Sequence, residues 1–267
     1  MNWIYFPLYA LITAIFWVIG TSLIFASKRK SILKPLGHIA LLLGIGTITT
    51  FVVILWLQLG RPPMRTLGET RLWYALFLLV IGYVTFVRWG YQWVLILIFF
   101  FASIFLVTDL LHPETYEKTL MPALQSPWFV PHVIVYIFAY AMLGFSWVFS
   151  IYGLYMFYFK SFSMKVLNVA DNLVYIGFAF LTMGLLFGAL WAKEAWGHYW
   201  TWDPKETWAF LTWLVYLVYI HTRYFHYTKV RLHLWMLSFI FIVLLLCWFG
   251  INYMPSAKNS VHVYSNE

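Results

Sequence analysis

Eight stretches of about 20 apolar residues recur along this 267-residue chain, and they limit its fold more than any other feature. A helix of that length crosses the hydrocarbon of a bilayer, where backbone groups must bond to one another. Because 63% of the residues are hydrophobic and only 10% are charged, a soluble domain is excluded. The sequence therefore predicts an all-α, polytopic integral membrane protein. The expected spans are 4–26, 37–59, 72–87, 92–110, 132–159, 173–192, 208–222 and 232–251.

The charges between these spans predict the orientation. If the N-terminus lies outside, the inner loops hold ten Lys or Arg residues and one acid, Asp171, whereas the outer segments hold seven bases and eight acids. Positive charge collects on the inner side of membrane proteins, so we expect both termini outside. The formal net charge of +8 then reflects topology, and the expected surroundings are lipid rather than nucleic acid.

No repeat or long linker divides the chain, so residues 1–267 are expected to form a single membrane domain. The inner loops are short, which places any chemistry on the outer face or within the membrane. Cys247 is the one cysteine. The chain therefore has no internal disulfide and no CxxC or CxxCH motif of its own.

The segment 191–208, WAKEAWGHYWTWDPKETW, lies between the sixth and seventh spans and is expected on the outer side. Trp196 and Trp200 are four apart and would share a helix face, while Asp203-Pro204 would end that helix and Glu206 would start the next. Such a density of indole rings suggests an external surface for a large, flat aromatic ligand. The alternative is an aromatic belt with a capping turn.

Three histidines are candidate metal ligands. His132 and His262 fall on the outer side and could supply both axial ligands of a metalloporphyrin, although each could be an ordinary interfacial residue. His221 falls about 20 Å along the seventh span, where ionisable groups usually face protein or a partner. It could also be an interfacial residue beside Arg223, and His38 could face it from the second span.

Three arginines, Arg61, Arg65 and Arg71, are the outer cations best suited to carboxylates such as haem propionates. They could equally be loop charges that pair with Glu69.

The tryptophan segment resembles a known family. The run WAKEAWGHYWTWDPKETWAF is similar to the "WWD" segment of haem-handling proteins of cytochrome c biogenesis, and most similar to the CcsA (ResC) type. The stretch PALQSPWFVPHV, which contains His132, and the segment YIHTR, which contains His221, also resemble that family. SVHVYS around His262 departs from the family's usual form. The resemblance covers the chain from about residue 122 onward.

The resemblance implies a subunit of a cytochrome c synthase of the haem lyase type. Haem b would be held on the outer face by His132 and His262, and then attached covalently to CxxCH motifs of apocytochrome c. His221 would serve an inner haem site, and no residue of the chain would be catalytic. The docking residues implied are Trp191, Trp196, Trp200, Trp202, Asp203 and Trp208; His198 is not expected to be a ligand.

The family also implies partners and a location. The partners would be a ResB (CcsB) type membrane subunit and, indirectly, thiol reductant proteins. The membrane would be the bacterial cytoplasmic membrane or an equivalent energy-transducing one, with segment 191–208 on its outer side. Two alternatives remain open: a CcmC-like haem chaperone or exporter that passes haem to a separate carrier, and an electron-transfer protein with a resident haem.

Overall fold

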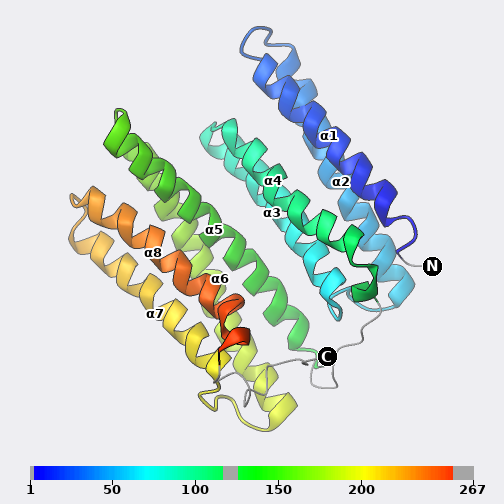
Figure 1. Ribbon diagram of the computed structural model, residues 1–267, viewed down its shortest axis with the longest axis vertical. Coiled ribbons are helices and arrows are strands. Elements are labelled where there is room, and N and C mark those ends of the chain that lie inside the picture. Colours follow the sequence, from blue (N-terminus) through cyan, green and yellow to red (C-terminus); the bar gives the residue numbers. More distant parts are fainter. Residues whose placement is uncertain (1–2, 117–125, 255–267) are drawn as a thin grey trace. The chain divides into compact units, whose positions relative to one another are not determined.

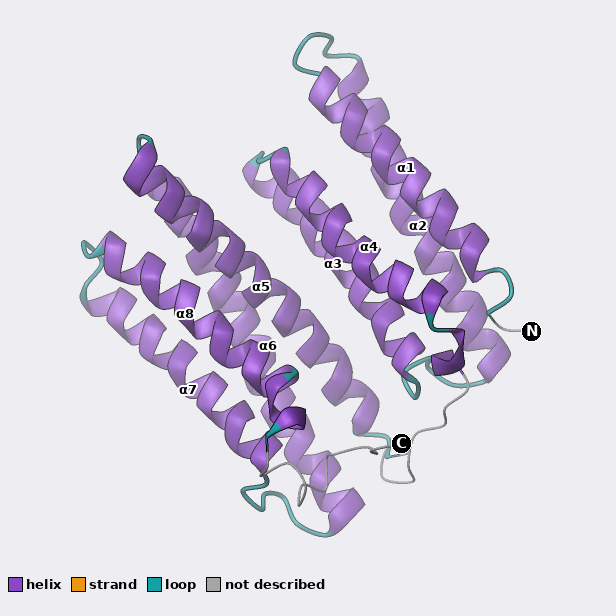
Figure 2. Ribbon diagram, viewed as in Figure 1, coloured by secondary structure: helices purple, strands orange, loops and turns teal. Residues whose placement is uncertain are grey.

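The computed structural model describes residues 3–116 and 126–254. Within these residues the secondary structure is helical and contains no strand, which confirms the predicted all-α class (Figure 2). Each predicted span corresponds to one long helix. The helices are α1 (Phe6–Ala26), α2 (Leu33–Leu59), α3 (Leu67–Trp89), α4 (Trp93–Leu111), α5 (Phe129–Phe159), α6 (Met164–Trp196), α7 (Pro204–Phe225) and α8 (Val230–Trp248). Two short 3-10 helices, η1 (Pro113–Tyr116) and η3 (Gly250–Tyr253), follow α4 and α8.

Seven of these helices are long and apolar enough to cross a membrane, so the chain is an integral membrane protein. The exception among the long helices is α7, the shortest of the predicted spans. It carries Lys205 and Glu206 in its first turn and Arg223 in its last, which lowers its hydropathy. It nevertheless forms 22 residues of helix and packs on both α6 and α8.

Helix α6 begins nine residues before the predicted span. Asp171, which was predicted to lie in an inner loop, therefore belongs to this helix. The Asp171 side chain is 7% exposed and pairs with Arg223 of α7, which the sequence had also suggested as a loop residue. Both charges are therefore buried within helices, and they neutralise each other. The loops predicted to lie on the inner side keep their excess of basic residues.

The helices form two compact units, Met1–Leu120 and Met121–Glu267. In the first unit α1 pairs with α2 and α3 pairs with α4. In the second unit α5 lies along α6 and α8, and α7 completes the bundle against α8 (Figure 1). That residues 1–267 act as a single membrane domain stays a prediction.

The second unit has a tryptophan-rich end and a basic end. At the tryptophan-rich end, α5 and α7 begin while α6 and α8 finish, so segment 191–208 lies there. At the basic end, α5 and α7 finish while α6 and α8 begin, and Lys160, Lys165, Lys229 and Arg231 lie there.

Candidate functional site

His132 lies in the first turn of α5, at the tryptophan-rich end. Its Nδ1 is 2.9 Å from the carbonyl oxygen of Gly184 in α6. A carbonyl oxygen can only accept, so in a neutral ring this contact assigns the hydrogen to Nδ1 and the lone pair to Nε2. A metal-binding histidine is usually held in this way, with one nitrogen donating to a carbonyl while the other binds the metal.

Glycines in α6 make room for that ring. A Cβ atom at Gly188 would lie 2.8 Å from Cε1 of His132, and one at Gly184 would lie 2.7 Å from the Tyr136 ring. The two glycines are four residues apart, the spacing that lets membrane helices approach closely. The sequence interpretation missed this pair, although the GLLFG pattern was a usable signal.

Trp191 of α6 packs against His132, and Trp196 packs on Trp191. The ring of Trp191, which is 4% exposed, lies 5.4 Å from the imidazole and 4.9 Å from Trp196. At the end of α6, the Glu194 carboxylate accepts a hydrogen bond of 2.7 Å from the Ser126 hydroxyl. The structure thus brings one predicted iron ligand together with two of the predicted docking tryptophans.

The prediction that Trp196 and Trp200 share a helix face is wrong. Helix α6 ends at Trp196 because Gly197 adopts the left-handed conformation, with φ of 85°, and caps it. Trp200 therefore lies in the loop that leads to α7, where its ring contacts Trp202 at 5.9 Å. Its buried Nε1 makes no hydrogen bond to a described residue.

Trp202 has an unusual backbone. Its φ is 58°, in a region that residues with a Cβ rarely adopt, and its side chain is 64% exposed. A bulky apolar residue that is both strained and exposed calls for a functional explanation.

The acids beside Trp202 hold this loop in place. The buried Asp203 begins α7 and accepts a 2.9 Å bond from the backbone N–H of Lys205. Glu206 reaches back to accept from the backbone N–H of Asp203 at 3.2 Å and of Thr201 at 2.8 Å. This capping box, in which Glu206 starts the helix as predicted, anchors both sides of Trp202. Trp208 follows in α7 and is half-buried.

His262 and His198 are both predicted to lie on the outer side. His262 lies outside the described residues. His198 is exposed in the loop after α6.

His221 lies toward the basic end and points away from the bundle. The buried residues of α7 include Thr212, Tyr216, Tyr219 and Arg223, whereas His221 is exposed. Its Nδ1 contacts the Leu217 carbonyl oxygen at 3.0 Å, so the lone pair of a neutral ring is again on Nε2. A ligand bound there would therefore be completed by groups outside the α5–α8 bundle.

A buried polar cluster occupies the inward face of α7 at the same level. Asp171 accepts a 2.5 Å hydrogen bond from the Tyr219 hydroxyl and a 2.9 Å ion pair from Nε of Arg223. His233 of α8 is fully buried and lies 6.0 Å from the Tyr219 ring. Neither of its ring nitrogens hydrogen-bonds to a described residue. The sequence interpretation missed this cluster, because its members are far apart along the chain.

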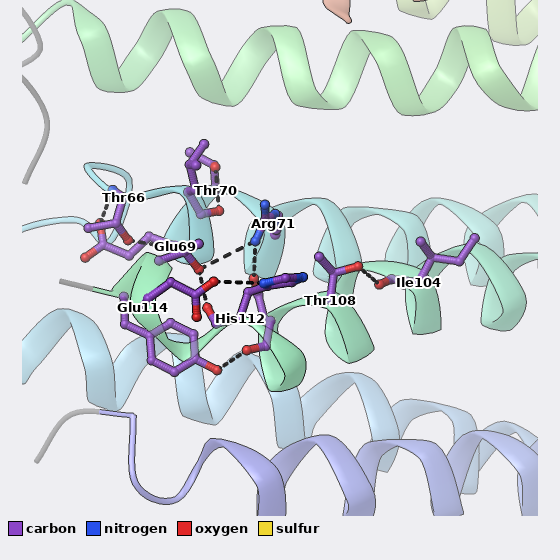
Figure 3. Close-up of polar contacts among 12 residues, drawn as sticks. Thr66, Glu69, Thr70, Arg71, Ile104, Thr108, His112 and Glu114 are labelled. Carbon is purple, nitrogen blue, oxygen red and sulfur yellow. Dashed lines mark hydrogen bonds and ion pairs between the residues drawn. The ribbon is translucent and has the colours of Figure 1, made fainter. Parts of the chain in front are cut away.

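Two of the three arginines predicted on the outer side, Arg61 and Arg71, pair with acids of the first unit; Figure 3 shows the contacts of Arg71. Arg61 forms two hydrogen bonds to Glu69, at 2.9 and 3.0 Å, as the alternative interpretation expected. Arg71 lies 3.4 Å from the fully buried Asp109. His38 contacts the Tyr83 hydroxyl at 3.0 Å. Among the described residues, no group of three His, Cys, Asp or Glu side chains could hold a metal ion.

Comparison with known proteins gives consistent relatives. A family described as "Cytochrome C assembly protein" matches residues 5–257. The "Cytochrome c biogenesis protein CcsA" of Chlamydomonas reinhardtii is 43% identical over 149 residues, which cover 53% of this chain but only 42% of that protein. CcsA of Mesostigma viride is 29% identical, with 94% and 93% covered, and CcsA of Cuscuta reflexa is 31% identical, with 78% and 80% covered.

One solved structure has the same fold. The "Cytochrome c Heme Lyase CcmF" superposes with a TM-score of 0.68 at 15% identity. The match covers 93% of this chain and 47% of that one, so the chain spans about half the length of CcmF.

Proposed function

We propose that this chain holds haem b at its tryptophan-rich end for transfer to apocytochrome c. The chain belongs to the cytochrome c assembly protein family and is of the CcsA type. His132 would bind the iron through Nε2, and His262 would bind the opposite face. The observation that carries this proposal is the 2.9 Å contact between Nδ1 of His132 and the Gly184 carbonyl, which prepares the ring as a ligand.

The tryptophans would position the porphyrin. Trp191 packs beside His132, Trp196 packs on Trp191, and the exposed indole of Trp202 offers a flat apolar face. Asp203, predicted as a docking residue, would act through the backbone by holding Trp202 in its strained conformation. Orientation of this kind raises the effective concentration of the reacting groups.

The proposed reaction joins haem to a CxxCH motif. Each thiol adds across one vinyl group: sulfur bonds to one carbon, hydrogen goes to the other, and no oxidant is consumed. The motif's own histidine would replace one protein ligand on the iron. Because Cys247 is the chain's one cysteine and is buried, both reacting thiols come from the substrate.

We further propose that His221 contributes to an inner haem site shared with a ResB-type subunit. Its outward direction supports this, because the imidazole is exposed and hydrogen-bonds only to the Leu217 carbonyl of its own helix among the described residues. The membrane would be a bacterial cytoplasmic membrane or an equivalent one, with the tryptophan-rich end outside.

The test uses the chain purified with its ResB-type partner from haem-replete cells. His132→Ala should shift or abolish the Soret band and stop thioether formation on a CxxCH substrate. His198→Ala is the matched control, because it removes an exposed imidazole from the same end and should change neither readout. Unaltered haem content and cytochrome maturation in a His132→Ala/His262→Ala variant would refute the proposal. Co-purification of a haem-carrier protein instead of a ResB-type subunit would favour the CcmC-like alternative.

A further inference from the structure

A groove opens at the basic end of the second unit, between the last turns of α5 and the start of α8. Its volume is about 600 Å³, and it is lined by Phe157, residues 228–232 and Trp235. It is separate from the tryptophan-rich end, where the proposed haem ligand His132 lies.

Two cations border this groove. Lys229 and Arg231 are both exposed, and within the described residues neither forms an ion pair with a carboxylate. The nearby acid Asp171 is already paired with Arg223 and is 7% exposed. The guanidinium of Arg231 is held 5.6 Å above the Tyr158 ring, which fixes its position at the edge of the groove. The groove therefore presents positive charge that the described protein does not neutralise.

The rest of the lining is apolar and partly open. Phe157 and Trp235 are each 40% exposed, and Leu232 is 42% exposed. The indole N–H of Trp235 donates to the Tyr158 hydroxyl at 3.3 Å, which holds the Trp235 ring at the groove. Tryptophan and tyrosine rings of this kind are typical of the level of lipid headgroups.

We propose that this groove binds an anionic phospholipid. Its phosphate would contact Lys229 and Arg231, and an acyl chain would lie along Phe157, Leu232 and Trp235. Basic pockets beside membrane helices are established sites for such headgroups. A lipid fits the groove better than haem does, because no His, Cys or Met lines it and the neighbouring His233 is fully buried. The propionates of haem could pair with Lys229 and Arg231, but its iron would have no ligand.

The test measures retained lipid by native mass spectrometry after reconstitution with phosphatidylglycerol or phosphatidylcholine. We expect one phosphatidylglycerol to be retained, and Lys229→Gln/Arg231→Gln to weaken its retention roughly 30-fold, from the loss of two surface cations. Trp235→Ala should weaken retention of the same lipid through the acyl chain. The matched control is Lys28→Gln/Arg29→Gln, which removes two exposed cations from the loop after α1 and should leave retention unchanged.

Three results would overturn the proposal. One is equal retention of phosphatidylcholine, and another is an equal loss of phosphatidylglycerol in the control pair. The third is loss of haem absorbance in Lys229→Gln/Arg231→Gln with bound lipid unchanged, which would assign the groove to haem.

Discussion

Replacing Asp171 by asparagine removes the negative charge that neutralises the buried guanidinium of Arg223. The shape of the side chain is kept, and the amide oxygen can still accept from the Tyr219 hydroxyl. Arg223 would keep its 2.8 Å hydrogen bond to the Tyr227 carbonyl. Its charge, however, would lack a counterion at a site where its side chain is only 10% exposed.

The expected cost follows from that burial. Removing one partner of a buried ion pair destabilises a protein by about 3–5 kcal/mol, because the other charge stays desolvated. For a chain of this size, that loss lowers the unfolding midpoint by ~10 °C. Arg223→Gln should have a similar effect, since it leaves the Asp171 carboxylate buried. The double variant Asp171→Asn/Arg223→Gln contains two neutral amides and should recover most of the loss.

The chain supplies its own probe of unfolding. Cys247 in α8 is its one cysteine and is 7% exposed, so a fluorogenic maleimide reacts with it only when the helices separate. Fluorescence during heating in detergent then gives the midpoint of the bundle that contains Asp171. Glu114→Gln is the control, because it also removes a carboxylate beside a base, but one whose side chain is 60% exposed.

Two results would refute this reasoning. One is a midpoint for Asp171→Asn within about 2 °C of the unmodified protein, which would mean that water or lipid headgroups already solvate Arg223. The other is a double variant as unstable as the sum of the two single variants, which would mean that the charges do not interact.

Three further predictions concern other parts of the chain. Gly188→Ala places a Cβ 2.8 Å from the His132 ring, so it should perturb the Soret band as His132→Ala does; Gly46→Ala, with open space around its Cβ, should leave the spectrum unchanged. Trp202→Gly should reduce haem retention and raise the unfolding midpoint slightly, since glycine tolerates φ of 58° and relieves ~1 kcal/mol of strain. A fall in both haem retention and the unfolding midpoint would contradict the view that the backbone of Trp202 is strained. Burial, followed by the nearby Asp109 and Glu114 charges, raises the pKa of Tyr116 to about 12. The unfolded chain therefore loses this proton first as pH rises, and stability should fall between pH 10 and 12. Circular dichroism should find this fall smaller in Tyr116→Phe than in the unmodified protein.

The helices were predictable because their signal is local. Apolar runs located each of the eight, and Asp203-Pro204-Lys205-Glu206 located the start of α7, since a capping residue, a proline and an acid act within one turn. The true start of α6 was not predictable in this way. The buried carboxylate of Asp171 is stabilised by Arg223, which lies 52 residues later in the chain.

The arrangement of the candidate site was not predictable from the sequence. Trp196 and Trp200 have helical spacing, yet Gly197 between them ends the helix, and its ability to adopt positive φ outweighs the spacing. The pairing of His132 with the Gly184 carbonyl depends on how α5 packs on α6, which is a contact across 52 residues. The direction of His221 likewise depends on which face of α7 the buried Tyr219 and Arg223 occupy.

The position of Cys247 also has a consequence for selectivity. Thiol–disulfide exchange needs an accessible thiolate, and this thiol is enclosed by the helices of its own bundle. A protein that receives substrates with two reactive thiols would otherwise be open to cross-linking with them. Its single sulfhydryl is buried, so under the proposed function an incoming CxxCH segment would meet no accessible thiol on this chain.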